Sequence, residues 1–195
     1  SSRIIQMTGK PYIISTVENI TERKAADIAF QTMVSSMLGT SGLESLDRIT
    51  ENLAAWLRAD CVMIGRILPD REHVEVLSMV LDGKRAAGFR YTLKGTPCED
   101  AAGRGFCHYP DNVAQAFPKS RDLQEYGIRG YAGTPLRDSD GKTVGLISIM
   151  TREPLDLPPS ARQIIDIIAV KAAAEIRSIP ARGIMGKMRG KRQTR

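Results

Sequence analysis

The sequence has few of the residues that build disulfide-stabilised or metal-dependent proteins. Its 195 residues include three cysteines, Cys61, Cys98 and Cys107, and two histidines, His73 and His108. An odd number of cysteines without a Cys-x-x-Cys pair argues against a disulfide framework and a zinc site, and suits a reducing cytoplasm. No apolar run approaches the roughly 18–20 residues that a membrane-spanning helix requires. We therefore expect a cytoplasmic protein without a membrane span or bound metal.

Motifs that carry catalysis are also scarce. The segment Asp138-Ser139-Asp140-Gly141 lacks the downstream glutamate of an EF-hand calcium loop, and Gly103-Arg104-Gly105 lacks the Lys-Ser/Thr of a phosphate-binding loop. Glu99 and Asp100 are neighbours in the sequence, and we expect them to cap a short helix rather than act as an acid–base pair. These absences favour a protein that is not an enzyme.

Acidic residues are missing from the C-terminal end, which carries the positive charge of the whole chain. The formal net charge is +6, and seven basic residues follow Glu175: Arg177, Arg182, Lys187, Arg189, Lys191, Arg192 and Arg195. Removing seven charges from +6 leaves −1 for residues 1–176, so the folded body is not basic. We interpret residues 179–195 as a solvated basic tail or linker. The alternative, binding of nucleic acid or anionic lipid by this tail, is disfavoured.

A helix with one apolar face is predicted near the N-terminus. A turn at Gly9-Lys10-Pro11 precedes a β-rich run at residues 12–17, and Asn19 with Glu22 forms a capping box that starts a helix. One apolar stripe then runs along this helix through Ala26, Ala29, Phe30, Met33, Val34, Met37 and Leu38. A monomer would leave the stripe in water, so we expect a parallel homodimer through helices 19–40 and 160–177.

The remainder of the chain predicts an α+β domain. A helix is expected over residues 43–58, followed by strands at 61–67, 74–80 and 89–93, then by an irregular segment at 95–130. Two further strands, 131–136 and 143–151, form a hairpin around Asp138-Ser139-Asp140-Gly141. A last helix follows Pro158-Pro159-Ser160, with Ile164, Ile165, Ile168, Ala172 and Ile176 on its buried face and Ile167 widening that face. Hairpin-length connections predict an antiparallel sheet with helices packed on it, and a long irregular segment is typical of a functional lid.

Two blocks resemble known families. The segment from Gly9-Lys10-Pro11-Tyr12 through residues 19–27, Asn-Ile-Thr-Glu-Arg-Lys-Ala-Ala-Asp, resembles the final strand and exit helix of a PAS domain. Asn19 stands where that pattern has Asp, and Asp27 where it has Glu. The resemblance implies that residues 1–18 are the C-terminal strand remnant of a PAS domain. Residues 19–40 would then be a linker or signalling helix.

The second block, residues 41–178, resembles the GAF domains of bacterial signalling proteins. It is carried by an ordered set of motifs: Tyr91-x-Leu93-x-Gly95-Thr96-Pro97-Cys98, Tyr109-Pro110-x-x-Val113, Phe117-Pro118, Leu123, Gly127, Tyr131-x-Gly133-x-Pro135-Leu136, Asp138-Ser139-x-Gly141, Gly145 and Pro154-Leu155. The resemblance implies a profilin-like sheet with a small-molecule pocket walled by the irregular segment. It also implies an output domain of the GGDEF, EAL or histidine kinase kind elsewhere in the protein. Lys119-Ser120 departs from the acidic position expected after Phe117-Pro118, which weakens any detailed inference about the ligand.

The predicted ligand-binding residues combine apolar walls with a few polar groups. They are Tyr91, Thr96, Cys98, Tyr109, Phe117, Leu123 and Tyr131. The alternative for each aromatic residue is that it merely fills the core between sheet and lid. The sequence names neither the ligand nor a cofactor.

Three other functions of GAF domains fit poorly. Bilin-binding domains carry a Cys-His pair where this chain has Ser120-Arg121-Asp122-Leu123-Gln124, and Cys107-His108 lies elsewhere. Cys98 and Cys107 resemble part of a thiol-dependent methionine sulfoxide reductase, yet residues 122–126 lack the catalytic cysteine. The N-K…F…D-E pattern of cyclic-nucleotide-binding GAF domains is absent. We therefore expect a non-catalytic sensory domain, with a ligand-free structural dimerisation or spacer module as the main alternative and the reductase as a more remote one.

Overall fold

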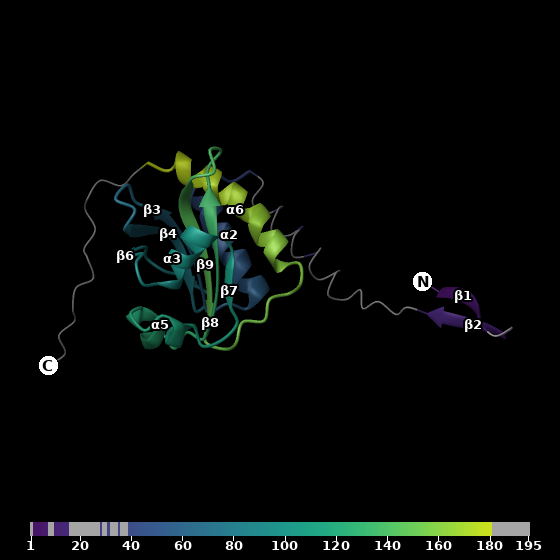
Figure 1. Cartoon of the computed structure of the whole chain (residues 1–195). Coiled ribbons are helices and arrows are strands. Elements are labelled where there is room, and N and C mark those ends of the chain that lie inside the picture. The colour runs from purple at the N-terminus through teal and green to yellow at the C-terminus, as the bar shows by residue number, and fades with distance from the viewer. Residues whose placement is uncertain are drawn as a thin grey trace.

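The computed structural model describes residues 2–7, 10–15, 28, 31, 35 and 39–180. The predicted helix cap at Asn19, the apolar stripe from Ala26 to Leu38 and the basic residues from 181 onwards lie outside the described residues. Near the N-terminus, β1 (Ser2–Met7) pairs antiparallel with β2 (Lys10–Ser15), as Figure 1 shows. The predicted strand after Gly9 is β2, whereas β1 was not expected from the sequence.

The main body is built on a seven-stranded antiparallel sheet. Its strands are β3 (Cys61–Ile67), β4 (His73–Leu81), β5 (Lys84–Arg85), β6 (Arg90–Thr92), β7 (Cys107–Tyr109), β8 (Gly130–Arg137) and β9 (Thr143–Thr151). The spatial order is β5-β4-β3-β9-β8-β7, and β6 pairs with another part of β4. Every pairing in it is antiparallel. The predicted α+β fold is confirmed.

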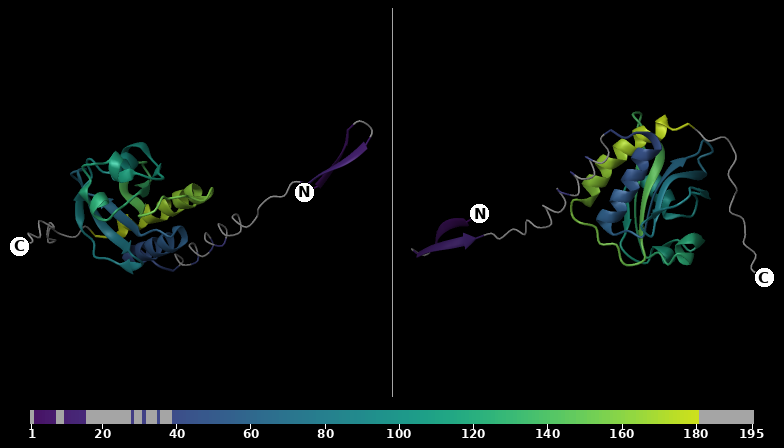
Figure 2. Two further views of the ribbon diagram at one scale, coloured as in Figure 1. Left: turned by 90° about the horizontal axis from the view of Figure 1, so that it is seen from below. Right: turned by 180° about the vertical axis from the view of Figure 1, so that it is seen from behind.

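Helices cover both faces of this sheet (Figure 2). Helices α2 (Gly42–Leu57) and α6 (Ala161–Ser178) pack on one face, where Leu46, Ile49 and Ile168 are fully buried. Helices α3 (Pro97–Arg104), α4 (Val113–Ala116) and α5 (Arg121–Glu125) belong to the segment over the other face. Because both faces are covered, the central strands β3 and β9 are nearly continuous runs of buried residues rather than alternating ones.

The segment at residues 95–130 is more ordered than the sequence predicted. Glycine and proline keep its elements short, as expected, yet it contains α3, β7, α4 and α5. Strand β7 pairs with β8 and extends the sheet by one strand. The irregular lid of the sequence analysis is therefore a series of short elements, and part of it belongs to the sheet itself.

Two glycines allow close approach inside the sheet. A Cβ atom at Gly133 would lie 2.4 Å from the hydroxyl oxygen of Tyr131, so the Tyr131 ring lies against the bare backbone of its own strand. A Cβ atom at Gly145 would lie 2.5 Å from the carbonyl oxygen of Gly65 and 2.8 Å from Cδ1 of Ile176. Both positions therefore require glycine for packing, with no demand for an unusual backbone angle.

Helix α6 departs from the prediction at one position. Ile167 was expected to widen the buried face, but its side chain is 54% exposed, and that of Val170 is 72% exposed. The buried face instead includes Ala169 and Ala173, small residues that let α6 approach the sheet and α2 closely. Ile167 and Val170 thus form an apolar strip on the outer side of the helix.

Candidate functional site

A cavity of about 730 Å³ lies on the sheet face covered by the segment 95–130. Strands β3, β4, β6, β8 and β9 contribute to it, together with the start of α3 and the region of α5. Five of the predicted ligand-binding residues line it: Tyr91, Thr96, Cys98, Leu123 and Tyr131. Its volume lies within the range of ordinary small-molecule sites.

Two predicted site residues do not line the cavity. Tyr109 and Phe117 pack edge to face, with ring centroids 5.3 Å apart, and Tyr109 also lies 6.3 Å from the Tyr131 ring. The Tyr109 hydroxyl donates a 2.5 Å hydrogen bond to Oδ2 of Asp100. These two rings support the wall formed by Tyr131 from behind, so for them the core-filling alternative describes the structure.

Most of the cavity wall is apolar, and three methionines contribute to it. Met63 on β3, Met79 on β4 and Met150 on β9 were not expected at the site from the sequence. Met63 follows Cys61 by two positions on one strand, so strand alternation could have placed both on the same face. The other apolar lining residues are Leu68, Leu81, Phe89, Pro97, Leu123, Tyr126 and Ile128.

Uncharged polar groups gather around two lining residues, Cys98 and Tyr131, with Ser148 behind them; we call this group, together with Tyr91, the floor of the cavity. The Tyr131 hydroxyl, the Cys98 thiol and the Ser148 hydroxyl form a buried triangle in which each pair of atoms is 3.3 Å apart. The Tyr91 hydroxyl also interacts with the Cys98 thiol. Burial raises the pKa of both tyrosines well above its ordinary value and raises the pKa of Cys61 to about 12. The floor of the cavity therefore keeps its hydroxyls and the Cys61 thiol protonated.

Local capping holds the start of α3 at the cavity. Gly95 donates its backbone N–H to Oε2 of Glu99 at 2.7 Å, and the Thr96 hydroxyl donates to the Leu93 carbonyl at 2.6 Å. Thr96 is the N-cap residue, Pro97 follows it at the first helical turn, and Glu99 lies three residues after the cap. Of the two predicted capping residues, Glu99 therefore binds a backbone N–H at the helix start, whereas Asp100 instead contacts the side chains of Tyr109 and Arg104. This cap positions Thr96 and Cys98 in the cavity wall.

An arginine joins the far end of the lid to the sheet. Arg152, just after β9, donates from Nε to the Tyr126 carbonyl at 3.1 Å. Its other nitrogens contact Asp60 at 3.0 Å and Asp82 at 2.6 Å. Because Tyr126 lines the cavity, Arg152 fixes one side of the opening against the ends of β3, β4 and β9.

The charged residues of the lining lie toward the solvent. Asp70 and Asp122 are exposed acids, while His73 and Arg90 are partly exposed. Asp70 contacts Nδ1 of His73 at 2.9 Å, and Arg90 donates to Glu75 at 2.9 Å. The cavity thus has a charged mouth and an uncharged interior.

Comparison with known proteins decides the family. A model of the GAF domain matches residues 42–176, well over half of the chain. The chain belongs to the GAF domain family. No curated protein matches the sequence significantly.

Solved structures with the same fold include other GAF domains and phytochrome fragments. The GAF domain of a phosphoenolpyruvate-protein phosphotransferase from Coxiella burnetii aligns with a TM-score of 0.66 at 16% identity, covering 83% of this chain and 96% of that one. The chromophore-binding domain of Stigmatella aurantiaca phytochrome P1 aligns with a TM-score of 0.63 at 13% identity, and the match covers 89% of this chain and 68% of that one. The photosensory core module of the Stigmatella aurantiaca phytochrome aligns with a TM-score of 0.65 at 13% identity, and the match covers 91% of this chain and 42% of that one. These similarities establish the fold.

A row of charged residues lies on the face of the GAF sheet opposite the cavity. Arg66 on β3, Glu75 on β4 and Arg90 on β6 lie directly opposite one another in the strand register. Arg66 donates to Oε2 of Glu75 at 2.8 Å, and Arg90 donates to Oε1. Burial alone would raise the pKa of Glu75, but the hydrogen bonds and charges of Arg90 and Arg66 outweigh it, and its pKa is lowered. We call this row the Arg–Glu–Arg ladder.

The ladder also reaches the end of α6. Arg66 donates from Nη1 to the Ile179 carbonyl at 2.8 Å and from Nη2 to the Pro180 carbonyl at 3.3 Å. Nearby, the buried carboxylate of Glu175 accepts a 2.6 Å hydrogen bond from the backbone N–H of Gly42, the first residue of α2. The start of α2 is therefore bound to α6, and the chain just after α6 is bound to Arg66 of the ladder.

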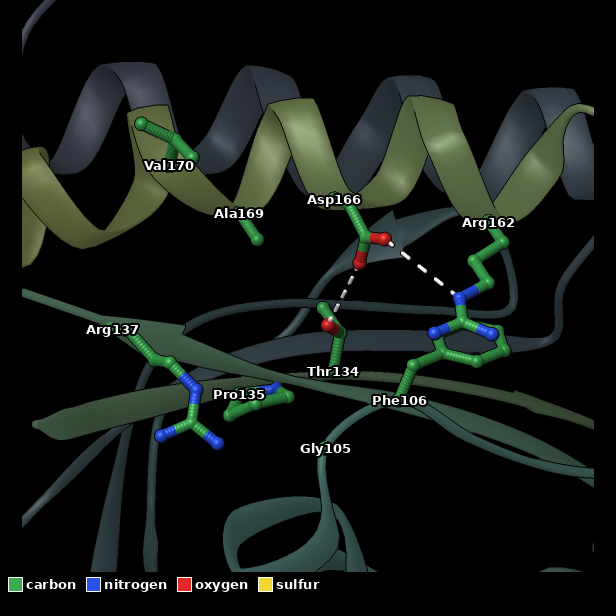
Figure 3. Close-up of a pocket in the computed structure, with 9 residues that line it drawn as sticks. All are labelled: Gly105, Phe106, Thr134, Pro135, Arg137, Arg162, Asp166, Ala169 and Val170. Atoms are coloured by element: carbon green, nitrogen blue, oxygen red, sulfur yellow. Dashed lines mark hydrogen bonds and ion pairs between the residues drawn. The ribbon is translucent and has the colours of Figure 1, made fainter. Parts of the chain in front are cut away.

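A smaller hollow of about 250 Å³ lies between α6 and β8 (Figure 3). Arg162 stacks over the Phe106 ring at 5.4 Å, and Asp166 contacts Arg162 at 3.9 Å and Thr134 at 3.4 Å. The polar groups here satisfy one another across a shallow opening. The larger cavity is therefore the better candidate for a functional site.

The side chains of Cys107 and His108 are separated by their strand. The pair lies on β7, where the two side chains point to opposite faces: the Cys107 thiol faces the Pro97 carbonyl and His108 Nε2 contacts the Leu155 carbonyl at 2.9 Å. Among residues 39–180 and the other described positions, no group of three or more His, Cys, Asp or Glu side chains could hold a metal ion. No helix among them is both long and apolar enough to cross a membrane.

Proposed function

We propose that this GAF domain is a non-catalytic sensor that binds a small molecule in the 730 Å³ cavity and passes its occupancy to an output domain. The observation that carries the proposal is the cavity itself, with apolar walls, a few uncharged polar groups inside and an opening between lid and sheet. A purely structural spacer would gain stability by filling such a space with side chains. The sensory origin of the phytochrome fragments with this fold adds support.

The raised pKa values of Cys61 and Cys107 argue against the enzymatic alternative. A thiol-dependent reductase needs a thiolate, which requires a lowered pKa. Burial raises the pKa of Cys61 to about 12 and that of Cys107 to about 11. Cys107 also lies outside the cavity lining, so it could not act on a molecule bound there. The three unpaired cysteines fit a cytoplasmic protein.

Signal transmission would use the contacts at the ends of the domain. A ligand can shift the conformational equilibrium only by its different affinity for two states. Movement of β6 on ligand binding would change the Arg–Glu–Arg ladder and, through Arg66, the carbonyl groups at residues 179–180. On the N-terminal side, residues 9–27 resemble the end of a PAS domain, which supports an upstream sensor domain that passes its signal to this GAF domain. The output domain would be of the GGDEF, EAL or histidine kinase kind.

A homodimer through α6 fits this scheme. The outer side of α6 carries Gln163, Ile167, Val170, Ala174 and Arg177 at alternating steps of four and three, and all five are exposed. This spacing is the seam of a two-helix coiled coil, with Ile167, Val170 and Ala174 as its apolar centre. We propose that a second copy of the chain covers this seam, together with the helix predicted at residues 19–40.

A thermal-shift screen combined with native mass spectrometry tests the proposed function. A compound that binds the native state must raise the melting temperature in proportion to the logarithm of its concentration above Kd. We expect some member of a diverse metabolite panel to do so, and a Leu123→Trp variant, which fills the cavity, to lose the response. If no compound of any charge class raises the melting temperature and nothing co-purifies, the ligand-free spacer is the correct function.

A further inference from the structure

From the distribution of polar groups in the cavity, we infer that its ligand is an uncharged, flat, largely aromatic molecule with one hydrogen-bonding atom directed at the Tyr91 hydroxyl. The inference rests on the proposed function, since it names the ligand class of the same cavity. The polar and charged groups of the interior and of the mouth determine which ligands the cavity can hold.

The first step is the absence of charge inside the cavity. The lining residues that bear charge are Asp70, His73, Arg90 and Asp122, and all four are at least partly exposed at the mouth. Within residues 39–180, no lysine or arginine reaches the buried part of the lining. A buried carboxylate or phosphate without a partner costs far more than an uncharged group of the same size. An anionic group therefore has no stable position in the interior.

The second step is that the mouth does not compensate for this. Its one arginine, Arg90, borders the cavity but directs its guanidinium to Glu75 on the other face of the sheet, and His73 contacts Asp70. The remaining charged residue, Asp122, is acidic. An anion at the mouth would lie near two carboxylates, which disfavours it further.

The third step is the hydrogen-bonding capacity of the floor. Tyr131, Cys98 and Ser148 can satisfy one another, because each brings one hydrogen and can accept another within the 3.3 Å triangle. Tyr91 joins this group from β6 through Cys98, and residue 91 is partly exposed and lines the cavity whereas Tyr131 is fully buried, so a ligand entering from the mouth meets Tyr91 first. A phenolic hydroxyl has one hydrogen and can also accept, so it keeps hydrogen-bonding capacity beyond its interaction with Cys98. The floor thus offers one donor–acceptor position. The high pKa of Tyr91, caused first by burial, keeps that hydroxyl neutral.

The fourth step is the character of the walls. Met63, Met79 and Met150 present polarizable thioethers from three strands, and Phe89 and Tyr91 form an aromatic pair with centroids 5.9 Å apart. Thioethers and ring edges make favourable contacts with the faces and edges of aromatic rings. A flat ring system is therefore better matched to this space than a sugar or a flexible acid.

Isothermal titration calorimetry with three probes tests the inference. Naphthalene, 2-naphthol and 2-naphthoate share one ring system; at neutral pH the first two are uncharged and the third is an anion. We expect 2-naphthol to bind at least tenfold more tightly than 2-naphthoate. Tyr91→Phe should weaken 2-naphthol about fivefold, the ordinary contribution of one hydrogen bond, and leave naphthalene unchanged. The control Tyr109→Phe keeps its ring, removes a hydroxyl outside the cavity lining and should change none of the three affinities.

The outcomes separate this inference from the sensor function. Binding of 2-naphthoate as tight as that of 2-naphthol, or an unchanged 2-naphthol affinity in Tyr91→Phe, overturns the ligand class and leaves the sensor in place. If the screen yields an anionic ligand and no uncharged one, the ligand class is likewise overturned and the sensor function is kept. Failure of every compound, charged or uncharged, rejects the sensor and the ligand class together.

Discussion

The Arg–Glu–Arg ladder gives the sharpest prediction about stability, through the variant Glu75→Gln. Glu75 has a side chain that is 10% exposed and accepts one hydrogen bond from Arg66 at 2.8 Å and one from Arg90 at 2.9 Å. Removing one partner of a fully buried ion pair costs about 3–5 kcal/mol. Glutamine keeps one acceptor, and Arg90 is 31% exposed and can be solvated, so we expect a loss of about 2–3 kcal/mol in the free energy of unfolding. At about 2–4 °C per kcal/mol, the melting temperature should fall by roughly 5–10 °C.

The dependence of this loss on pH identifies its cause. The pKa of Glu75 is lowered in the folded protein from its ordinary value of 4.5, so its charge stabilises the fold above that value. The contribution is lost as the pH falls through the folded-state pKa. Urea denaturation should therefore show a constant gap between wild type and Glu75→Gln at neutral pH, and the gap should shrink in acid.

Two controls make the ladder prediction refutable. Glu72→Gln removes the same charge from an exposed position just before β4 and should change the stability by less than about 0.5 kcal/mol. Hydrogen exchange should quicken at the Ile179 amide in Glu75→Gln, since Arg66 holds the carbonyl of that residue. Equal stabilities of Glu75→Gln and Glu72→Gln, or a gap that grows in acid, would contradict the electrostatic reasoning.

Three further predictions concern packing, assembly and the lid. Gly133→Ala should displace the Tyr131 ring and cost about 1–3 kcal/mol in urea denaturation, because the new Cβ would overlap the hydroxyl. Val170→Lys should give the mass of one chain by light scattering at concentrations where wild type gives two, while Val170→Ala should weaken the dimer without abolishing it. Arg152→Met should leave the sheet folded but quicken hydrogen exchange around Tyr126, and exchange that is unchanged there would remove Arg152 from its role as lid anchor.

The elements with strong local patterns were predictable from the sequence. Strands β3 and β9 begin and end where the sequence predicted, because each is an apolar run with turn residues close by. Helix α2 begins and ends one residue earlier than predicted. The three-residue strand β7 was missed, because so short a segment shows no alternation, and its pairing with β8 comes from tertiary context.

The candidate site was predictable only in part. Tyr91 and Cys98 lie in motifs that the family resemblance marks, and both line the cavity. Tyr109 lies in such a motif as well, yet it packs behind the wall. An aromatic residue in a short strand can face either side of the wall, and the sequence does not distinguish the two. The three methionines were missed because methionine is an ordinary core residue, and only the fold shows that these three border an open space.

The ladder could not be inferred from the sequence, and the reason bears on how the domain works. Alternation assigns Arg66 and Glu75 to a face within each strand, but it does not set the register between strands, and the bulge at Ile64 and Gly65 shifts that register. The bulge puts Arg66 opposite Glu75, within reach of the carbonyl groups that end α6. Because β6 carries Tyr91 into the cavity and the Arg90 guanidinium to the other face, one three-residue strand contacts both the cavity and the ladder. A ligand that shifts β6 must therefore strain or relax a charged contact with the end of α6, where the chain leaves the domain.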